Sequence, residues 1–134
     1  MKLALAVAAL ILLTAQADAQ DSEKSEDSGT IVMYRQGSIM GAALGCPIRY
    51  RGEELVELGR NKFAEWEVPP GSYILSNKTS SIEVNVFPGQ TKFVRCVIKA
   101  GMFTGRADLQ IVDEETFRKN SDDFERKEIA IPAE

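Results

Sequence analysis

The sequence contains no histidine among its 134 residues, and it has only two cysteines and one tryptophan. The absence of histidine removes the commonest general base and the commonest nitrogen ligand for zinc. Sixteen lysines and arginines stand against 20 acidic residues, and they are spread along the chain without forming a basic stripe. Because a basic stripe is the usual mark of a nucleic-acid-binding surface, we expect no nucleic-acid partner. We also expect no metal or other cofactor, since no motif for one is present.

The long apolar run of the sequence stands at the N-terminus, where Lys2 precedes an unbroken apolar stretch over residues 3–13. Ala17-Asp18-Ala19 then places small residues around a cleavage site, with residues 15–17 as a second choice. This order is typical of a secretory signal peptide. An uncleaved membrane anchor is the alternative, but the run is shorter than the about 20 residues that span a bilayer.

No cysteine follows this run to accept a lipid. We therefore expect residues 1–19 to be removed, leaving a protein that is periplasmic or secreted, is not a lipoprotein and is not inserted in the membrane. Residues 20–29 (QDSEKSEDSG) are acidic and rich in serine, so they can bury little apolar surface. We predict that they form a flexible tail.

Export bears directly on the two cysteines, Cys46 and Cys96. An oxidising compartment favours a disulfide between them. Such a bridge would close a loop of about 50 residues, which stabilises the fold by roughly 4 kcal/mol in the chain-entropy model. Two buried free thiols that pack as small apolar groups are the alternative.

From Thr30 onward, short β-branched and aromatic runs recur between glycine, proline, asparagine and serine residues. This spacing predicts an all-β sandwich or barrel over residues 30–113. The eight candidate strands cover residues 30–35, 47–51, 55–58, 63–68, 72–76, 81–87, 92–99 and 108–112. The clearest alternation is that of Ile82, Val84 and Val86 with Glu83 and Asn85, which predicts a strand with one buried face.

The C-terminal part, residues 114–134, contains many charged residues. In the stretch DEETFRKN, acidic residues lead and basic residues follow, which favours a short helical turn with Asp113 as its N-cap. Beyond this turn we expect a charged tail.

Pro69-Pro70-Gly71 joins two of the candidate strands. Pro70 and Gly71 suit the central positions of a type II turn, whereas tight hairpins prefer the primed turn types. We therefore predict a corner at which the chain passes from one sheet to the other. Tyr73 is predicted to pack its ring inward at this corner, on the same strand face as Leu75.

The stretch from Thr30 to Val112 resembles a bacterial family called domain of unknown function 2846. The residues that carry the resemblance are IVMYR as the opening strand, a glycine-containing loop, IRYRGEELVEL, FAEWEVPPGSYIL with its Pro-Gly-x-aromatic signature, and VFPGQTKFVRCVIKAG. The resemblance implies a two-sheet antiparallel sandwich of seven to eight strands with prealbumin-like (transthyretin-like) topology. No enzymatic activity is established for the family, so no catalytic residue is carried over, and we expect this protein not to be an enzyme.

In such a fold, strands 63–68, 30–35, 92–99 and 108–112 would form one sheet. Strands 55–58, 47–51, 72–76 and 81–87 would form the other. A bridge between Cys46 and Cys96 would then link the two sheets. Many family members look like lipoproteins, and this chain departs from them because it lacks the lipid-accepting cysteine.

One pattern suggests a ligand. Glu65 and Glu67 flank Trp66 on a predicted strand and share one face, an arrangement that could bind a glycan or perform acid–base chemistry. The alternative is a solvated strand face with Trp66 turned inward.

A second pattern suggests a partner contact. Ile39 and Met40 lie between glycines in one predicted loop, and Met102 and Phe103 lie between glycines in another. In an alternating sandwich both loops lie at the end opposite the Pro-Pro-Gly corner, where their apolar side chains could form an exposed patch. The alternative is that these side chains fold back and plug the end of the sandwich.

Together these patterns predict an exported, non-enzymatic β-sandwich that serves as a binding or accessory module of the cell envelope. Its partner would be another envelope protein or a second copy of the same chain. A small-ligand or glycan-binding domain that uses the Trp66 face is the alternative function.

Overall fold

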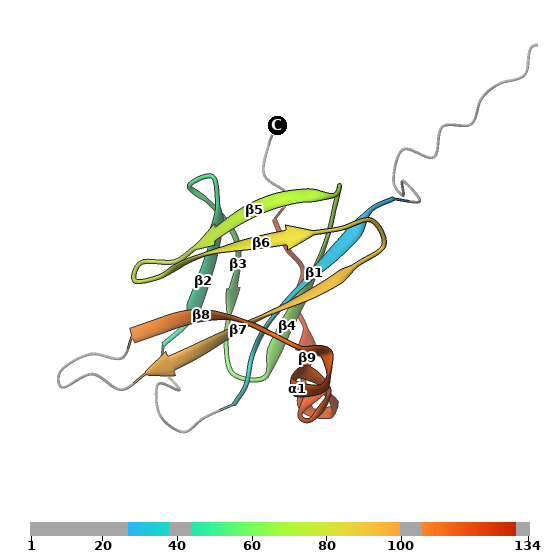
Figure 1. The fold of residues 1–134 in the computed structure, drawn as a ribbon. Coiled ribbons are helices and arrows are strands. Elements are labelled where there is room, and N and C mark those ends of the chain that lie inside the picture. The colour runs from blue at the N-terminus through green and yellow to red at the C-terminus, as the bar shows by residue number, and fades with distance from the viewer. Residues whose placement is uncertain (1–26, 38–43, 100–105, 131–134) are drawn as a thin grey trace, which may run out of the picture.

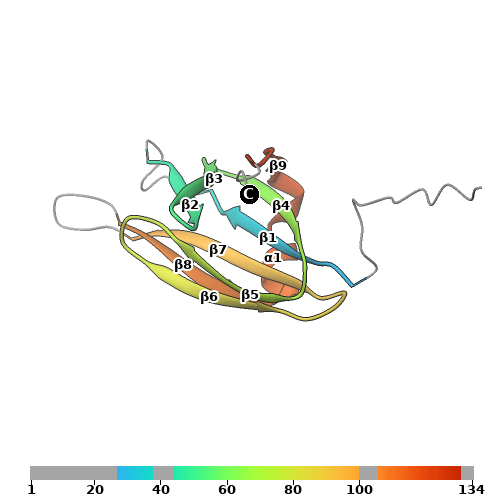
Figure 2. The same cartoon turned by 90° about the horizontal axis from the view of Figure 1, so that it is seen from above.

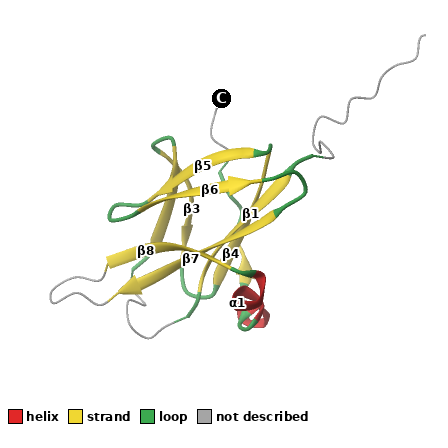
Figure 3. Cartoon of the chain, viewed as in Figure 1, coloured by secondary structure: helices red, strands yellow, loops and turns green. Residues whose placement is uncertain are grey.

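The computed structural model describes residues 27–37, 44–99 and 106–130. Nine strands are present in this part of the chain: β1 (Gly29–Arg35), β2 (Cys46–Tyr50), β3 (Glu53–Leu58), β4 (Lys62–Val68), β5 (Gly71–Ser76), β6 (Ser81–Val86), β7 (Thr91–Lys99), β8 (Arg106–Val112) and β9 (Glu125–Arg126). Helix α1 (Glu114–Arg118) and the 3₁₀ turn η1 (Ser121–Asp123) lie between β8 and β9. Figure 3 shows α1 beside a body made of strands. Within the described residues, no helix is long and apolar enough to cross a membrane.

The strands form two sheets that face each other (Figures 1 and 2). One sheet has the strand order β8-β7-β1-β4-β9, and the other has the order β3-β2-β5-β6. The predicted all-β sandwich is therefore confirmed, and each predicted strand lies in the predicted sheet. The five-stranded sheet is mixed, however, because β1 pairs with β7 in parallel and β9 pairs with β4 in parallel.

The end of the chain differs from the expected charged tail. Beyond α1, the chain forms η1 and then β9, which pairs Lys62 with Glu125 and Phe63 with Arg126 in register. The backbone N–H of Ala130 also donates to the carbonyl of Leu55 on β3, at 2.8 Å. We call residues 113–130 the C-terminal strap, because they cross the outer face of the five-stranded sheet from β8 at one edge to β4 near the other.

The main core lies between the two sheets. Its buried side chains alternate on β6, where Val84 and Val86 are buried while Glu83 and Asn85 are exposed. On β3 the consecutive residues Leu55 and Val56 are both buried, at an irregularity in the pairing of β3 with β2. The buried members are Ile31, Met33, Cys46, Ile48, Leu55, Val56, Leu58, Ala64, Val68, Tyr73, Leu75, Val84, Val86, Val94, Cys96 and Leu109. Cys46 on β2 and Cys96 on β7 form a disulfide with their Cα atoms 6.6 Å apart, so the predicted bridge links the two sheets through the core.

A second apolar layer covers the outer face of the five-stranded sheet. We call it the outer aromatic layer, and it consists of the buried Val32, Tyr34 and Phe93 with the half-buried Phe63, Val112, Phe117 and Phe124. β1 is therefore buried on both faces, which explains its unbroken apolar run from Ile31 to Tyr34. Phe117 of α1 stacks on Phe93 with ring centroids 5.0 Å apart, and it meets the edge of Tyr34 at 4.9 Å.

The Pro-Pro-Gly segment carries the chain from β4 in one sheet to β5 in the other, as predicted. The predicted type II turn is wrong, because Gly71 does not have a positive φ and already pairs with Val86 as the first residue of β5. The chain changes sheets here without reversing tightly, so no left-handed residue is needed. Positive φ instead occurs at Arg51 and Gly52, in the two-residue turn that joins β2 to β3.

Candidate functional site

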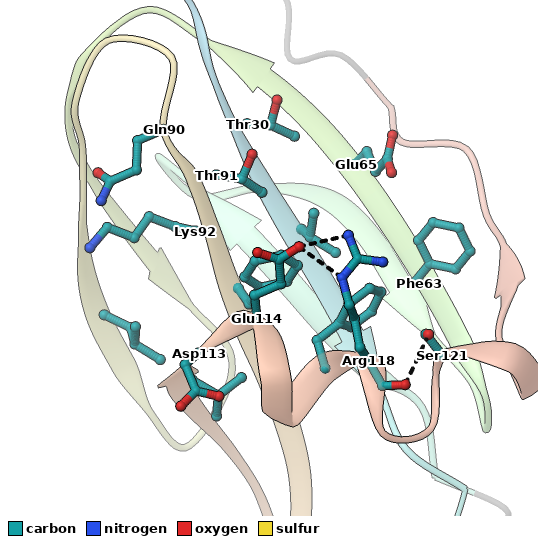
Figure 4. Close-up of a pocket in the computed structure, with 15 residues that line it drawn as sticks. Thr30, Phe63, Glu65, Gln90, Thr91, Lys92, Asp113, Glu114, Arg118 and Ser121 are labelled. Atoms are coloured by element: carbon teal, nitrogen blue, oxygen red, sulfur yellow. Dashed lines mark hydrogen bonds and ion pairs between the residues drawn. The ribbon is translucent and has the colours of Figure 1, made fainter.

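A groove of about 990 Å³ lies on the outer face of the five-stranded sheet (Figure 4). We call it the outer-face groove. It lies where the C-terminal strap leaves part of the sheet uncovered. Its lining residues are Thr30, Val32, Phe63, Glu65, Gln90, Thr91, Lys92, Phe93, Ile111, Val112, Asp113, Glu114, Phe117, Arg118 and Ser121.

Four strands provide the floor of the groove. β1 and β7 run side by side in parallel and bring Thr30 opposite Thr91, so two hydroxyl groups lie next to each other. Further along the same two strands, Val32 pairs with Phe93, and both residues belong to the outer aromatic layer. The floor therefore changes from polar at the start of β1 to apolar under α1.

Helix α1 forms one wall of the groove. Asp113 caps this helix, because its carboxylate accepts the backbone N–H of Thr116 at 2.8 Å. Hydrogen bonds from Thr116 to the carboxylate are the main reason that the pKa of Asp113 is below its usual value. Asp113 is thus an anion at neutral pH and holds the first turn of α1 in place.

The charges along the groove have both signs. Glu114 and Arg118 form an ion pair one helical turn apart, with 2.6 Å between a guanidinium nitrogen and the carboxylate, and Figure 4 shows the pair over the groove. Glu65 on β4 lies across from them and pairs with Arg126 of the strap at 3.5 Å. Lys92 extends from β7 on the opposite side. A ligand of this groove would therefore meet cations, carboxylates and hydroxyl groups together.

Tyr34 lies beneath α1 and has only 1% of its surface exposed. Its hydroxyl group is buried and has no hydrogen-bond partner in the described part of the chain. Burial raises the pKa of Tyr34 above its usual value, although the nearby Arg95 opposes this effect. Tyr34 therefore serves the outer aromatic layer as a packing residue.

Arg35 is a charged residue whose burial was not predicted. It is 1% exposed, and its guanidinium donates hydrogen bonds to the carbonyl of Leu58, at 3.3 Å, and to that of Leu44. Burial, aided by the charge of Arg60, lowers the pKa of Arg35. These bonds tie the end of β1 to the end of β3, away from the outer-face groove.

The predicted partner-contact residues Ile39, Met40, Met102 and Phe103 lie outside the described residues. The described flanks of their two loops do meet. A depression of about 580 Å³ is lined by Leu44 and Gly45 after the first loop, by Ile98 and Ala107 on either side of the second, and by the turn that joins β5 to β6. The partner contact remains a prediction for this end of the sandwich.

The Trp66 side chain packs against the main core and is half-buried there. Its ring meets the edges of Tyr50 and Tyr73, with centroids 5.1 and 5.5 Å away. Glu65 and Glu67 are on the opposite, outward face of β4. The Trp66 face therefore lacks the exposed ring that the glycan-binding alternative requires.

Tyr73 is 9% exposed and lies on the inner face with Leu75, and its hydroxyl donates to the carbonyl of Pro69. This hydrogen bond fastens the Pro-Pro-Gly corner to β5, the strand that follows it. Pro70 and Gly71 are exposed and line none of the described concavities. The corner is thus a structural feature and not part of the groove.

The predicted helical turn with Asp113 as its N-cap is confirmed, but the sequence did not indicate that this helix forms the wall of the outer-face groove. Two signals pointed toward it. The apolar run over residues 31–34 indicates a strand that is covered on both faces. Phe117 and Phe124 are isolated phenylalanines in a charged segment, and each needs an apolar surface to pack against.

A model for the family described as "Protein of unknown function (DUF2846)" matches residues 25–107. Because this match spans more than half of the 134 residues, the chain belongs to that family. No curated protein and no solved structure matches the chain. Most of β8 and the whole C-terminal strap follow the matched range, so the wall of the outer-face groove lies outside it.

Proposed function

We propose that this protein is an exported, non-enzymatic binding module of the cell envelope, and that a protein partner docks in the outer-face groove. The signal-peptide pattern of residues 1–19 supports export, and so does the disulfide between Cys46 and Cys96, because disulfides persist in oxidising compartments.

The observation that carries the proposal is the mixed lining of the groove. Hydroxyl, amide and carboxylate groups and two cations surround a floor that is partly apolar. Sites for small molecules are mostly apolar with few polar groups, whereas protein interfaces combine an apolar centre with a polar rim. An extended segment of a partner protein matches this lining best.

The proposal can be tested with one groove-filling substitution and one matched control. Thr91→Trp places a large side chain at the exposed floor of the groove, on β7. Ser72→Trp places the same side chain at an exposed strand position on the outer face of the other sheet. Each purified, folded variant is used to capture partners from an envelope extract.

We expect Thr91→Trp to lose the captured partner and Ser72→Trp to retain it at the level of the unmodified protein. Capture that is equal for all three proteins would contradict the proposed location of the site. The absence of any saturable partner, with the intact protein as bait, would contradict the binding function itself.

A further inference from the structure

The C-terminal strap lies on the surface of the sandwich, and none of its residues is fully buried. Neither α1 nor η1 contains a buried residue, and both residues of β9 are exposed. The strap inserts the half-buried Phe117 and Phe124 into the outer aromatic layer and packs Ile129 against the main core. The surfaces that receive it belong to β1, β3, β4 and β7.

Backbone hydrogen bonds and a short parallel pairing with β4 hold the strap on the sandwich. Glu125 and Lys127 donate their N–H groups to the carbonyls of Asn61 and Phe63, each at 2.8 Å, and Ala130 donates to Leu55. In these three bonds the sandwich provides the acceptor, at Asn61 just before β4, at Phe63 on β4 and at Leu55 on β3. A second polypeptide with the same residues would find the same acceptors.

The charges of the strap match the strand that receives it. Glu125 contacts Lys62, and Arg126 lies 3.5 Å from Glu65, both on β4. The Lys127 ammonium group donates to the carbonyl of Glu57 at 2.6 Å. These contacts fix the register of the strap on β4 and favour this particular segment as the occupant.

A single connection joins the strap to the sandwich, and it leaves from the far edge of the sheet. β8 ends at Val112, and Asp113 then has an extended backbone with φ −85° and ψ 168°. β8 and β9 occupy opposite edges of the five-stranded sheet. The contacts of the strap with β4 are thus made by Glu125 and Arg126, which are far along the chain from the connection at Asp113.

From these observations we infer that the C-terminal strap can be exchanged between two copies of the chain. The strap of one copy would lie on the five-stranded sheet of the other, with the same contacts that it makes within one chain. Exchange of an identical element is a low-cost route to a dimer, because it creates no new interface chemistry. The tethered strap has the advantage of a high effective concentration, so the exchanged dimer forms only in concentrated protein.

Exchange also changes how the outer-face groove is built. Thr91 and Lys92 come from the sandwich, whereas Asp113, Glu114 and Arg118 come from the strap. In the exchanged dimer, each groove is therefore completed by side chains of the second copy. This inference does not depend on the proposed function of the groove.

Zero-length coupling of amines to carboxylates tests the exchange in the unmodified protein. Equal amounts of ¹⁴N- and ¹⁵N-labelled chains are unfolded together, refolded at high concentration with the disulfide intact, coupled, and analysed by mass spectrometry. The ion pair of Lys62 with Glu125 joins the sandwich to the strap. The ion pair of Lys99 with Asp108, at 3.1 Å, is the control because both residues lie in the β7–β8 hairpin.

We expect mixed-isotope products for the Lys62–Glu125 link, at a fraction that rises with protein concentration, and unmixed products for the Lys99–Asp108 link. Unmixed products for both links would overturn the inference. Mixed products for both links would overturn it as well, because they would indicate contact between chains without strap exchange. A Lys99–Asp108 product without any Lys62–Glu125 product would remove the contact on which the inference rests.

Discussion

The outer faces of the two sheets have opposite characters, although the sheets share one core. On the five-stranded sheet, Val32, Tyr34 and Phe93 are buried beneath the C-terminal strap. On the four-stranded sheet, the outward-facing residues of β5 are Ser72, Ile74 and Ser76, and Ile74 is 60% exposed. The covered face also contains the outer-face groove, whereas the other face is a solvated sheet surface.

This difference shows how a small sandwich can gain a site without altering its core. The inner faces need only alternating apolar residues, and both sheets provide them. The covered face has a second set of apolar residues, which only a further segment of chain can bury. The strap buries that set incompletely, and the part that it leaves open becomes the groove.

The largest effect is expected from Tyr34→Ala, which removes a large side chain from the covered face. Tyr34 is buried against Phe117 and Phe124, so the substitution should lower the free energy of unfolding by about 3–5 kcal/mol. Ile74→Ala on the exposed face is the matched control and should change it by less than about 0.5 kcal/mol. Urea unfolding measures both, and similar losses for the two variants would remove the distinction between the faces.

A smaller loss is expected from Phe117→Ala, because this side chain is only half-buried. The substitution takes one ring out of the outer aromatic layer and should lower the free energy of unfolding by about 2 kcal/mol. Phe87→Ala is the control, since Phe87 is 63% exposed, and it should cost less than about 0.5 kcal/mol. If the two variants unfold at the same urea concentration, the strap does not stabilise the covered face.

Two tyrosine-to-phenylalanine substitutions, one in each sheet, compare the stability lost with a bonded hydroxyl group and with one that is unbonded in the described structure. Tyr73→Phe on β5 deletes the hydrogen bond to Pro69 and should cost about 1 kcal/mol. Tyr34→Phe on β1 deletes a buried hydroxyl that has no partner among the described residues, so its cost should be close to zero. Urea midpoints in the reverse order would show that the Tyr34 hydroxyl is bonded and the corner bond is weak.

The smallest effect is expected from the ionisation of two buried tyrosines, which acts in alkaline solution. Burial raises the pKa of both Tyr34 and Tyr73 above the usual value of 10.0. The unfolded chain therefore loses these protons first as the pH rises, so the contribution of these two groups to stability is constant below about pH 10 and falls above it. Tyr34→Phe should reduce that fall relative to the unmodified protein in urea titrations at several pH values. If stability falls equally in Tyr34→Phe and in the unmodified protein, groups other than Tyr34 cause the fall.

The strands β1 to β8 could be predicted because each of them carries its own local signal, and the family resemblance then favoured a sandwich over a barrel. Ile82, Val84 and Val86 alternate with polar residues, and the prolines before Gly71 exclude a continuous ladder there. The turn type at Gly71 was not predictable from its residues, because glycine permits a positive φ without requiring it. Whether that freedom is used depends on how the two sheets meet.

The short helix α1 could be predicted from its cap and charge pattern, but nothing local indicates that it lies over the five-stranded sheet and forms the wall of a groove. Phe117 and Phe124 stand alone among charged residues, and a single aromatic residue does not indicate which surface it covers. β9 pairs through only two residues, which is too short for any periodic pattern. The burial of Arg35 could not be predicted either, since the backbone carbonyls of Leu44 and Leu58 that accept its hydrogen bonds carry no signal in the sequence.

The most direct test is site-specific photocrosslinking from the two outer faces of the protein. A photoreactive amino acid replaces Thr91 in the outer-face groove or Ser72 on the other sheet, and both proteins are irradiated in the same envelope extract. We predict one dominant, saturable adduct from position 91 and none from position 72. Equal adducts from the two positions, or an adduct from position 72 alone, would contradict the assignment of binding to the covered face.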